Sequence, residues 1–404
     1  MSPSERARHA TRSLLLAAVV AGGASFSAPT VVANGGEAPL PVKSQGSFFI
    51  GGHKLQSADG SWFWVDQMYV QYQIPTGNPK TPVVLVHGGG GTGSVWESTP
   101  DGREGYQSLL IREGYPVYIV DFPRRGRAGY PAFTGGNIGS IDGTQYIPND
   151  VSKTTWQYGW TRWRLGPAFG QRFPVDQFGY GPVTPESPYG TGVDQFFKAL
   201  VPTVLDDADV ISDALVALFD KIGPGILITH SQSGLFGWKT AMRSRNVRGI
   251  VSYEPGFVFT QAGLPPPVPL YTGSMVAGTV VTNAEFAKLA KIPIQVVYGD
   301  NIPTTPVPDI PADGRRAQVI VSVPFAQQIN AIGGDTTILH LPDAGLRGNT
   351  HFMFSDRNNK QVLAQLLKFF KRKKLDRLDR PGNGHHDKYA EWNDDGRGHG
   401  HGHH

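Results

Sequence analysis

The sequence contains no cysteine among its 404 residues. Disulfides, thiolate nucleophiles and cysteine-ligated metal sites are therefore excluded. Charge is also scarce, because charged residues make up 17% of the chain and the formal net charge is only +4. No basic stripe precedes the C-terminal tail, so the sequence gives no sign of a nucleic-acid partner. The hydrophobic fraction of 39% is nevertheless large enough for an extensive folded core.

Long apolar runs are missing as well, apart from one near the N-terminus. Arg6, Arg8 and Arg12 precede the run LLLAAVVA at 14–21, and small residues follow it. This arrangement is typical of a secretory signal peptide, which we assign to residues 1–27. The run is too short to anchor the chain stably in a bilayer. We therefore expect a secreted or periplasmic protein without a membrane span.

Apolar runs alternate with amphipathic segments along the body of the chain. The segment 63–74 alternates in part, as an antiparallel strand does. Buried strands are expected where the apolar runs are continuous, at 82–89, 117–122, 225–230, 248–256, 292–300 and 336–341. Helices are expected at 103–113, 203–221, 234–244, 283–290, 316–332 and 356–374. This order predicts one α/β domain over 61–374, with a mainly parallel sheet, an antiparallel N-terminal edge and helices on both faces.

Two segments outside this pattern are polar. Residues 28–60 are predicted to be an N-terminal linker. Residues 375–404 form a charged, glycine-rich tail that holds six of the twelve histidines, and we expect this tail to be disordered. Its neutral imidazoles are able to bind a transition metal, but a solvated tail without a specific function is the favoured interpretation.

A third segment, 128–200, is rich in glycine, proline and aromatic residues. It follows a predicted buried strand, and in α/β sheets the loops after strand ends surround the functional site. We therefore expect a cap insertion here. Trp156, Trp160 and Trp163 have helical spacing, so they either pack the cap on the body or line an apolar acyl or aryl pocket.

Residues 229–233 read T-H-S-Q-S, between a predicted strand and a predicted helix. A nucleophilic serine on such a turn usually lies in G-x-S-x-G, because strand and helix approach closely and the flanking residues must be small. This chain has no G-x-S-x-G, but Thr229 and Ser233 are both small. Ser231 is therefore a candidate nucleophile. The alternative is a buried strand that merely ends in polar residues.

A second candidate element is the run HGGGGTGS at 87–94, directly after a buried strand. An oxyanion in a transition state needs backbone N–H donors that already point at it, and glycine lets the backbone approach closely. We expect the two donors to be the N–H of Gly89 or Gly90 and the N–H of Gln232. Dinucleotide binding is the competing interpretation, but there is no GK[ST], and G-x-G-x-x-G matches only loosely.

The candidate base is His351, in the loop 342–355 after the last predicted strand. In the order nucleophile, acid, base, the histidine comes last in the chain. His340 is its rival, but it lies inside the predicted strand 336–341 and would face a helix layer.

The candidate acid is either Glu254 or Asp300, since each ends a predicted parallel strand after the serine. Either carboxylate would fix the tautomer of His351 and stabilise its imidazolium form. The later strand is the commoner location, which favours Asp300, whereas the longer side chain of Glu254 can reach from the earlier strand. The residues alone leave both alternatives open.

With these elements in place, the chain resembles α/β-hydrolases over about residues 60–374. It is most similar to a branch of secreted bacterial esterases, on the motifs THSQSG (229–234), YEPG (253–256), GNTH (348–351), DRNN (356–359), WESTPDG (96–102) and FPRRGRAG (122–129). The resemblance implies Glu254 as the acid, with Asp300 as a site-wall or loop-anchoring residue. The four glycines at 88–91 depart from the branch, in which larger residues can occur.

The resemblance implies a serine carboxylesterase that acts through an acyl-enzyme on a small-molecule ester, with no cofactor and no metal. A lactonase or an aryl or polyester hydrolase would use the same triad. A non-catalytic binding protein on a hydrolase scaffold is the alternative from another class. The oligomeric state is left open, a homodimer included.

Overall fold

The computed structural model describes residues 38–56, 60, 62–129, 140–141, 144–145, 152–203 and 206–377. The chain divides into two units, Met1–Pro39 and Leu40–His404, and the fold below is that of the second unit. The predicted signal peptide, 1–27, and the predicted tail beyond residue 377 lie outside the described residues. Among the helices that are described, none is long and apolar enough to cross a bilayer.

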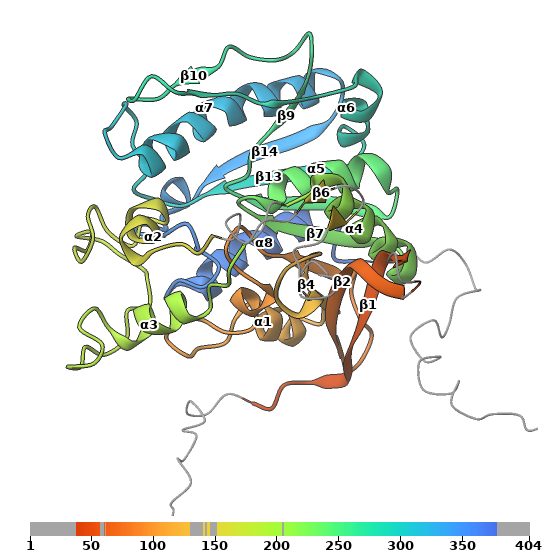
Figure 1. The fold of residues 1–404 in the computed structure, drawn as a ribbon, viewed down its shortest axis with the longest axis horizontal. Coiled ribbons are helices and arrows are strands. Elements are labelled where there is room, and N and C mark those ends of the chain that lie inside the picture. Colours follow the sequence, from red (N-terminus) through yellow and green to blue (C-terminus); the bar gives the residue numbers. More distant parts are fainter. Residues whose placement is uncertain are drawn as a thin grey trace, which may run out of the picture. The chain divides into compact units, whose positions relative to one another are not determined.

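An eight-stranded sheet forms the centre of the fold, in the order β1-β2-β4-β3-β7-β8-β13-β14 (Figure 1). The strands are β1 (Val42–Gln56), β2 (Trp62–Pro75), β3 (Val83–Val86), β4 (Val117–Asp121), β7 (Gly225–His230), β8 (Val247–Tyr253), β13 (Pro293–Tyr298) and β14 (Asp335–His340). The pairs β1–β2 and β2–β4 are antiparallel, and every pair from β4 to β14 is parallel. The prediction of a mainly parallel sheet with an antiparallel N-terminal edge is confirmed.

Helices cover both faces of the sheet. They are α1 (Tyr106–Arg112), α2 (Trp156–Arg162), α3 (Thr191–Lys198), α4 (Ala208–Ile222), α5 (Ser233–Arg243), α6 (Asn283–Leu289), α7 (Ile310–Ala331) and α8 (Asn359–Arg372). Successive strand residues face opposite sides: Leu85 packs in one core with α1 and α8, whereas Val86 packs in the other with α4 to α7. The short strands are β5 (Ser140–Ile141), β6 (Thr144–Gln145), β9 (Val258–Thr260), β10 (Val268–Pro269), β11 (Met275–Val276) and β12 (Thr279–Val281).

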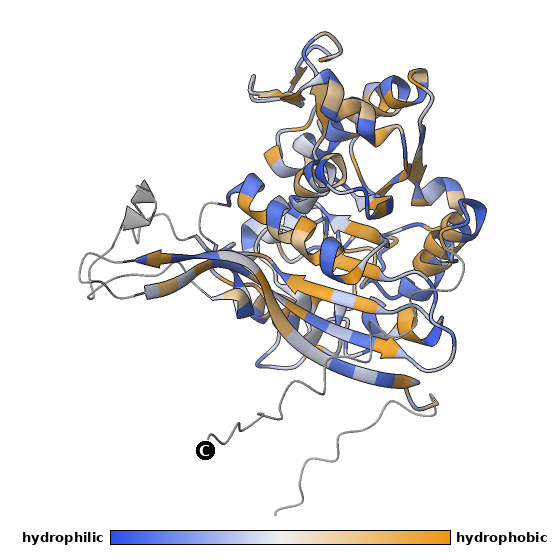
Figure 2. Ribbon diagram, turned by 90° about the vertical axis from the view of Figure 1, so that its right-hand side faces the viewer, coloured by the Kyte–Doolittle hydropathy of each residue, from blue (hydrophilic) through white to orange (hydrophobic). Residues whose placement is uncertain are grey.

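The prediction of a linker over 28–60 is wrong from residue 42 onward, because β1 pairs with β2 along nearly its whole length. This edge strand is largely exposed, so it shows little of the apolar pattern that marks a buried strand. In Figure 2 the long hairpin carries mixed hydrophilic and hydrophobic colours, and the neighbouring strands are mostly hydrophobic. Gly51 and Gly52 also interrupt the pattern, and both have positive φ, 67° and 75°.

The helix predicted at 316–332 begins earlier, at Ile310. The side chain of Asp309 caps it by accepting a hydrogen bond from the N–H of Ala312 at 2.8 Å, and Pro311 lies in the first turn. This earlier start matters for the site, because it places Arg315 on a helix and not on a loop.

Near the C-terminal end of the described residues, Leu375 belongs to the core and not to the predicted tail, since only 6% of it is exposed.

The longest described stretch of the predicted cap, 152–200, contains α2 and α3. Trp160 and Trp163 are buried there, and the Trp163 ring lies 5.3 Å from Phe196 and 5.5 Å from Phe352. Trp156 stacks on Phe197 at 4.7 Å. Trp163 therefore packs the segment against the body, whereas Trp156 stacks within the segment.

Candidate active site

Ser231 lies on a sharp turn between β7 and α5, with φ at 55°. Residues other than glycine rarely adopt this left-handed backbone conformation. Such local strain is typical of a serine presented to a substrate. Two hydrogen bonds hold the turn: the N–H of Ser231 donates to the carbonyl of Tyr253 at 2.8 Å, and the N–H of Gly234 donates to the carbonyl of Ser231 at 3.0 Å. The strand before it is fully buried, whereas Ser231 itself is partly exposed.

Glycines next to the turn take over the role of the missing G-x-S-x-G glycines. A Cβ atom on Gly237 would come within 2.7 Å of Cγ2 of Thr229. A Cβ atom on Gly234 would come within 2.3 Å of Cβ of Pro255. The close approach of helix and strand that the elbow needs is therefore made one turn further along α5.

Ser233 is small, and its side chain also forms hydrogen bonds. Its hydroxyl accepts a hydrogen bond from the N–H of His230 at 2.9 Å and lies 3.1 Å from the carbonyl oxygen of Val86, to which it can donate. The side chain is fully buried. Ser233 therefore ties the elbow to the end of β3, a role that its size alone does not suggest.

His351 and Glu254 meet in the interior. The Nδ1 atom of His351 lies 2.6 Å from Oε2 of Glu254, and both side chains are almost fully buried. Glu254 directly follows β8 and has φ at 49°, which turns its side chain away from the course of the strand. Asp300 does not take part, because its carboxylate accepts from the N–H of Gly348 and from that of Asn301, each at 2.7 Å. Of the two carboxylates left open by the residues, the structure brings Glu254 to the histidine and uses Asp300 to anchor the loop.

The glycine loop lies against the elbow. A Cβ atom on Gly88 would be 2.8 Å from Nδ1 of His230 and 3.1 Å from Cβ of Ser231, so only glycine permits this approach. Gly89 is partly exposed beside the side chain of Gln232. Within the described part of the chain, the N–H groups of Gly89 and Gln232 donate to no protein acceptor. Gly90 is buried, with φ at 76°, and its carbonyl accepts from Val201 at 2.9 Å.

Comparison with known proteins supports this fold. No family model matches the sequence. A probable secreted lipase, phiG, of Fungal sp. (strain ATCC 74256) is 29% identical over 324 residues, which span 74% of this chain and 84% of the relative. A novel bacterial esterase solved at atomic resolution is 29% identical, has a TM-score of 0.66, and covers 84% of this chain and 98% of its own. The chain has the α/β-hydrolase fold. The sheet order, the helices on both faces and the elbow all fit that assignment.

Arg164 is a residue of this hydrolase's site that the sequence did not reveal. Its guanidinium binds both oxygens of Glu254, with Nη1 donating to Oε2 at 3.0 Å and Nη2 donating to Oε1. Burial by itself would raise the pKa of Glu254, but Arg164 and then His351 outweigh burial and hold that pKa well below its usual range. Glu254 is therefore ionised beside His351.

Arg315 is the second residue that the sequence did not reveal. Its Nη2 atom donates to Nε2 of His351 at 3.0 Å and to Oγ of Ser231 at 3.3 Å. Burial, and after it the charge of Arg315, lowers the pKa of His351 well below its usual value. The imidazole is therefore neutral at physiological pH, with Nδ1 donating to Glu254 and the lone pair of Nε2 accepting from Arg315.

The backbone of the histidine loop is fixed from two sides. The Nε2–H of His230 donates to the carbonyl of His351 at 3.0 Å, so His230 holds the backbone of the candidate base. The N–H of His351 donates to the carbonyl of Trp163 at 3.0 Å. Asp356 accepts from the N–H and the hydroxyl of Thr350 at 2.7 and 2.9 Å. These contacts hold the imidazole in place within the hydrolase.

Gln232 is also held by a side-chain network. Its Nε2 donates to Oδ2 of Asp206 at 2.7 Å, and Arg125 donates to both oxygens of Asp206 at 2.7 and 2.8 Å. This network fixes the side chain of the residue that follows Ser231. This side-chain support was not predicted from the sequence.

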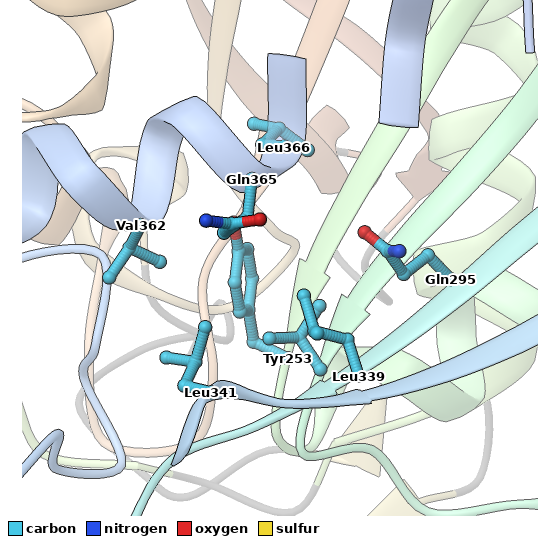
Figure 3. Close-up of a pocket in the computed structure, with 8 residues that line it drawn as sticks. Tyr253, Gln295, Leu339, Leu341, Val362, Gln365 and Leu366 are labelled. Atoms are coloured by element: carbon cyan, nitrogen blue, oxygen red, sulfur yellow. The ribbon is translucent and has the colours of Figure 1, made fainter. Parts of the chain in front are cut away.

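The pocket in Figure 3 lies between the strands β8, β13 and β14 and the helix α8. Aliphatic side chains such as Leu339, Leu341 and Leu366 line much of it, and Tyr253 points into it. Ser231, His351 and Glu254 do not line it, so it offers no place for a substrate next to Ser231.

Proposed function

We propose that this hydrolase is a secreted serine carboxylesterase in which Ser231 is the nucleophile, His351 the general base and Glu254 the residue that orients His351. The observation that carries the proposal is the buried pair of His351 and Glu254, 2.6 Å apart, beside a serine strained to a φ of 55°. A neutral imidazole held by an ionised carboxylate is the arrangement that nucleophilic catalysis by serine needs.

In the proposed reaction, Oγ of Ser231 attacks the ester carbonyl carbon while Nε2 of His351 takes its proton. The carbonyl oxygen becomes an oxyanion, and the N–H groups of Gly89 and Gln232 donate to it. The alcohol leaves with the proton from His351, and an acyl-enzyme remains. Water then loses a proton to His351 and attacks the acyl carbon, and His351 returns this proton to Oγ of Ser231 as the acid is released.

The broader enzyme class of this protein does not depend on these residue roles. The chain is a carboxylic ester hydrolase, since it has the hydrolase fold and its two relatives at 29% identity are a probable lipase and an esterase. We propose a small-molecule ester as the substrate. Secretion is supported by the N-terminal pattern at 1–27 and by the name of the fungal relative.

Ser231→Ala tests the proposal. We expect it to fold normally and to lose p-nitrophenyl acetate turnover by at least about 10³-fold, as removal of a triad nucleophile does. Ser274→Ala, in the exposed turn between β10 and β11, is the control and keeps full activity. If folded Ser231→Ala retains the turnover of the original protein, the proposal is wrong. If the unaltered protein neither turns over esters nor reacts with a fluorophosphonate, a binding protein on a hydrolase scaffold explains it better.

A further inference from the structure

Arg315 occupies the position that joins the proposed nucleophile to the proposed base. In a working triad, the lone pair of Nε2 on His351 accepts the hydroxyl hydrogen of Ser231. Here Nη2 of Arg315 donates to that lone pair at 3.0 Å and to Oγ of Ser231 at 3.3 Å. No hydrogen bond joins Ser231 to His351 directly in the described structure. The Arg315 donor must therefore leave before the proton can move.

The rest of the guanidinium is anchored elsewhere. Its Nη1 donates to the carbonyl of Glu254 at 3.1 Å and to Oε1 of Gln318 at 2.6 Å. Only Nη2 points at the reacting atoms. A small rotation would move Nη2 to a new acceptor while Nη1 keeps its partners nearby, so Arg315 can change partners without leaving the site.

The site carries more positive charge than its carboxylate balances. Arg164 takes both oxygens of Glu254, and Arg315 reaches that same carboxylate only through Nε at 3.7 Å. Among the described residues, Glu254 is the only acidic side chain in an ion pair with Arg315. Burial lowers the pKa of Arg315 to about 10, so it stays protonated at neutral pH. A buried guanidinium with an incomplete counter-ion is suited to an anionic ligand.

The positive charge of Arg315 becomes less favourable during catalysis. When His351 takes the serine proton it becomes an imidazolium, and the charge of Arg315 would lie about 3 Å from it. An anion that binds Arg315 would both neutralise this repulsion and free Nε2. Guanidinium and carboxylate match as bidentate partners, which makes a carboxylate the best such anion.

We propose that the substrate of this site is an ester that also carries a carboxylate, and that this carboxylate binds Arg315 and draws Nη2 away from Ser231 and His351. The inference rests on the proposed function and adds the substrate class to it. Because Nη2 lies next to Oγ of Ser231, the carboxylate must be only a few bonds from the scissile carbonyl. Monoesters of short dicarboxylic acids have this form.

Two ethyl esters of one shape test the proposal. Monoethyl succinate carries a carboxylate, and ethyl succinamate has an uncharged carboxamide in its place. We expect kcat/KM of the unaltered protein to be about tenfold or more higher for monoethyl succinate, because a site built to bind a charged group rejects the analogue that lacks it. Ethanol release measures both reactions without a chromophore.

Arg315→Gln removes the charge. We expect it to bring the ratio of kcat/KM for monoethyl succinate to kcat/KM for ethyl succinamate to within about twofold of one. Arg315→Lys keeps the charge and retains part of the preference. Arg316→Gln is the matched control, because Arg316 is a buried arginine on the same helix that pairs with Asp313 and contacts Pro269 outside the site. It should keep the preference of the unaltered protein.

An unaltered protein that hydrolyses both esters equally well, or prefers ethyl succinamate, overturns the proposal, whether or not Arg315→Gln folds. An equal loss on both esters in folded Arg315→Gln also overturns it, since Arg315 would then act on the reaction itself. In these cases, labelling of Ser231 by a neutral fluorophosphonate and inactive Ser231→Ala would leave the proposed function standing. Unchanged turnover in Ser231→Ala would instead refute the proposed function.

Discussion

The imidazole of His351 and the carboxylate of Glu254 share a buried hydrogen bond of 2.6 Å, although 97 residues separate them in the chain. Glu254 follows the strand next to the elbow, and Asp300 follows the strand beyond it. The longer glutamate side chain spans the distance from the nearer strand. This pairing determines which carboxylate the proposed mechanism uses.

Exchanging each carboxylate for its amide separates the two roles. Glu254→Gln should lower kcat by about 10³- to 10⁴-fold, because the amide no longer fixes the tautomer or stabilises the imidazolium. Asp300→Asn keeps an oxygen for the loop N–H groups and should lose less than about tenfold. Turnover of p-nitrophenyl acetate by both folded variants is the measurement. A larger loss in Asp300→Asn would show that the acid is misassigned.

The pH profile should reflect the low pKa of His351. The base works only when neutral, and burial followed by Arg315 lowers its pKa, so activity is lost only as the pH falls well below 6.5. Arg315→Gln removes the second-largest of the causes that lower this pKa, so the pKa rises and the acid limb of kcat/KM moves to higher pH. The profile is best measured with a neutral ester, with Arg316→Gln as the control. A limb that stays in place or moves to lower pH in Arg315→Gln would contradict this account.

The displaced glycine of the elbow makes a testable pair with Thr229. Gly237→Ala places a Cβ atom 2.7 Å from Cγ2 of Thr229, so we expect it to destabilise the fold by about 1–3 kcal/mol. Thr229→Ser removes Cγ2 but keeps the hydroxyl, which lies 2.6 Å from that of Ser252. The double variant should therefore be more stable than the sum of the single changes predicts, by about 1 kcal/mol.

Urea unfolding of the four proteins in this cycle measures that coupling. Strictly additive changes would mean that Gly237 does not make room for Thr229. The result bears on how an α/β-hydrolase can do without the glycines of G-x-S-x-G.

Much of the fold could be predicted from the sequence, because buried parallel strands read as continuous apolar runs. Strands such as β3 and β7 have this form and were found close to their observed bounds. The edge strand β1 was missed for the same physical reason, since an exposed strand interrupted by Gly51 and Gly52 carries no such run. The predicted helix at 316–332 started too late because the capping role of Asp309 was not recognised.

The arginines of the site were not predictable in the same way. Arg164 and Glu254 are 90 residues apart, and Arg315 and His351 are 36 apart, so no local spacing connects either pair. Ser231, His351 and Glu254 were named as candidates because motifs surround them. Arg164 lies in an irregular segment and Arg315 on an ordinary helix, and only the folded chain brings them to Glu254.

The most direct test of the account is to locate the label of a fluorophosphonate on the intact protein. The account predicts one equivalent on Oγ of Ser231, found by mass spectrometry of the peptide that contains it, and no label in Ser231→Ala. Prior heating, which unfolds the site, should abolish the reaction. A label on another residue, or undiminished labelling of folded Ser231→Ala, would contradict the claim that Ser231 is the nucleophile.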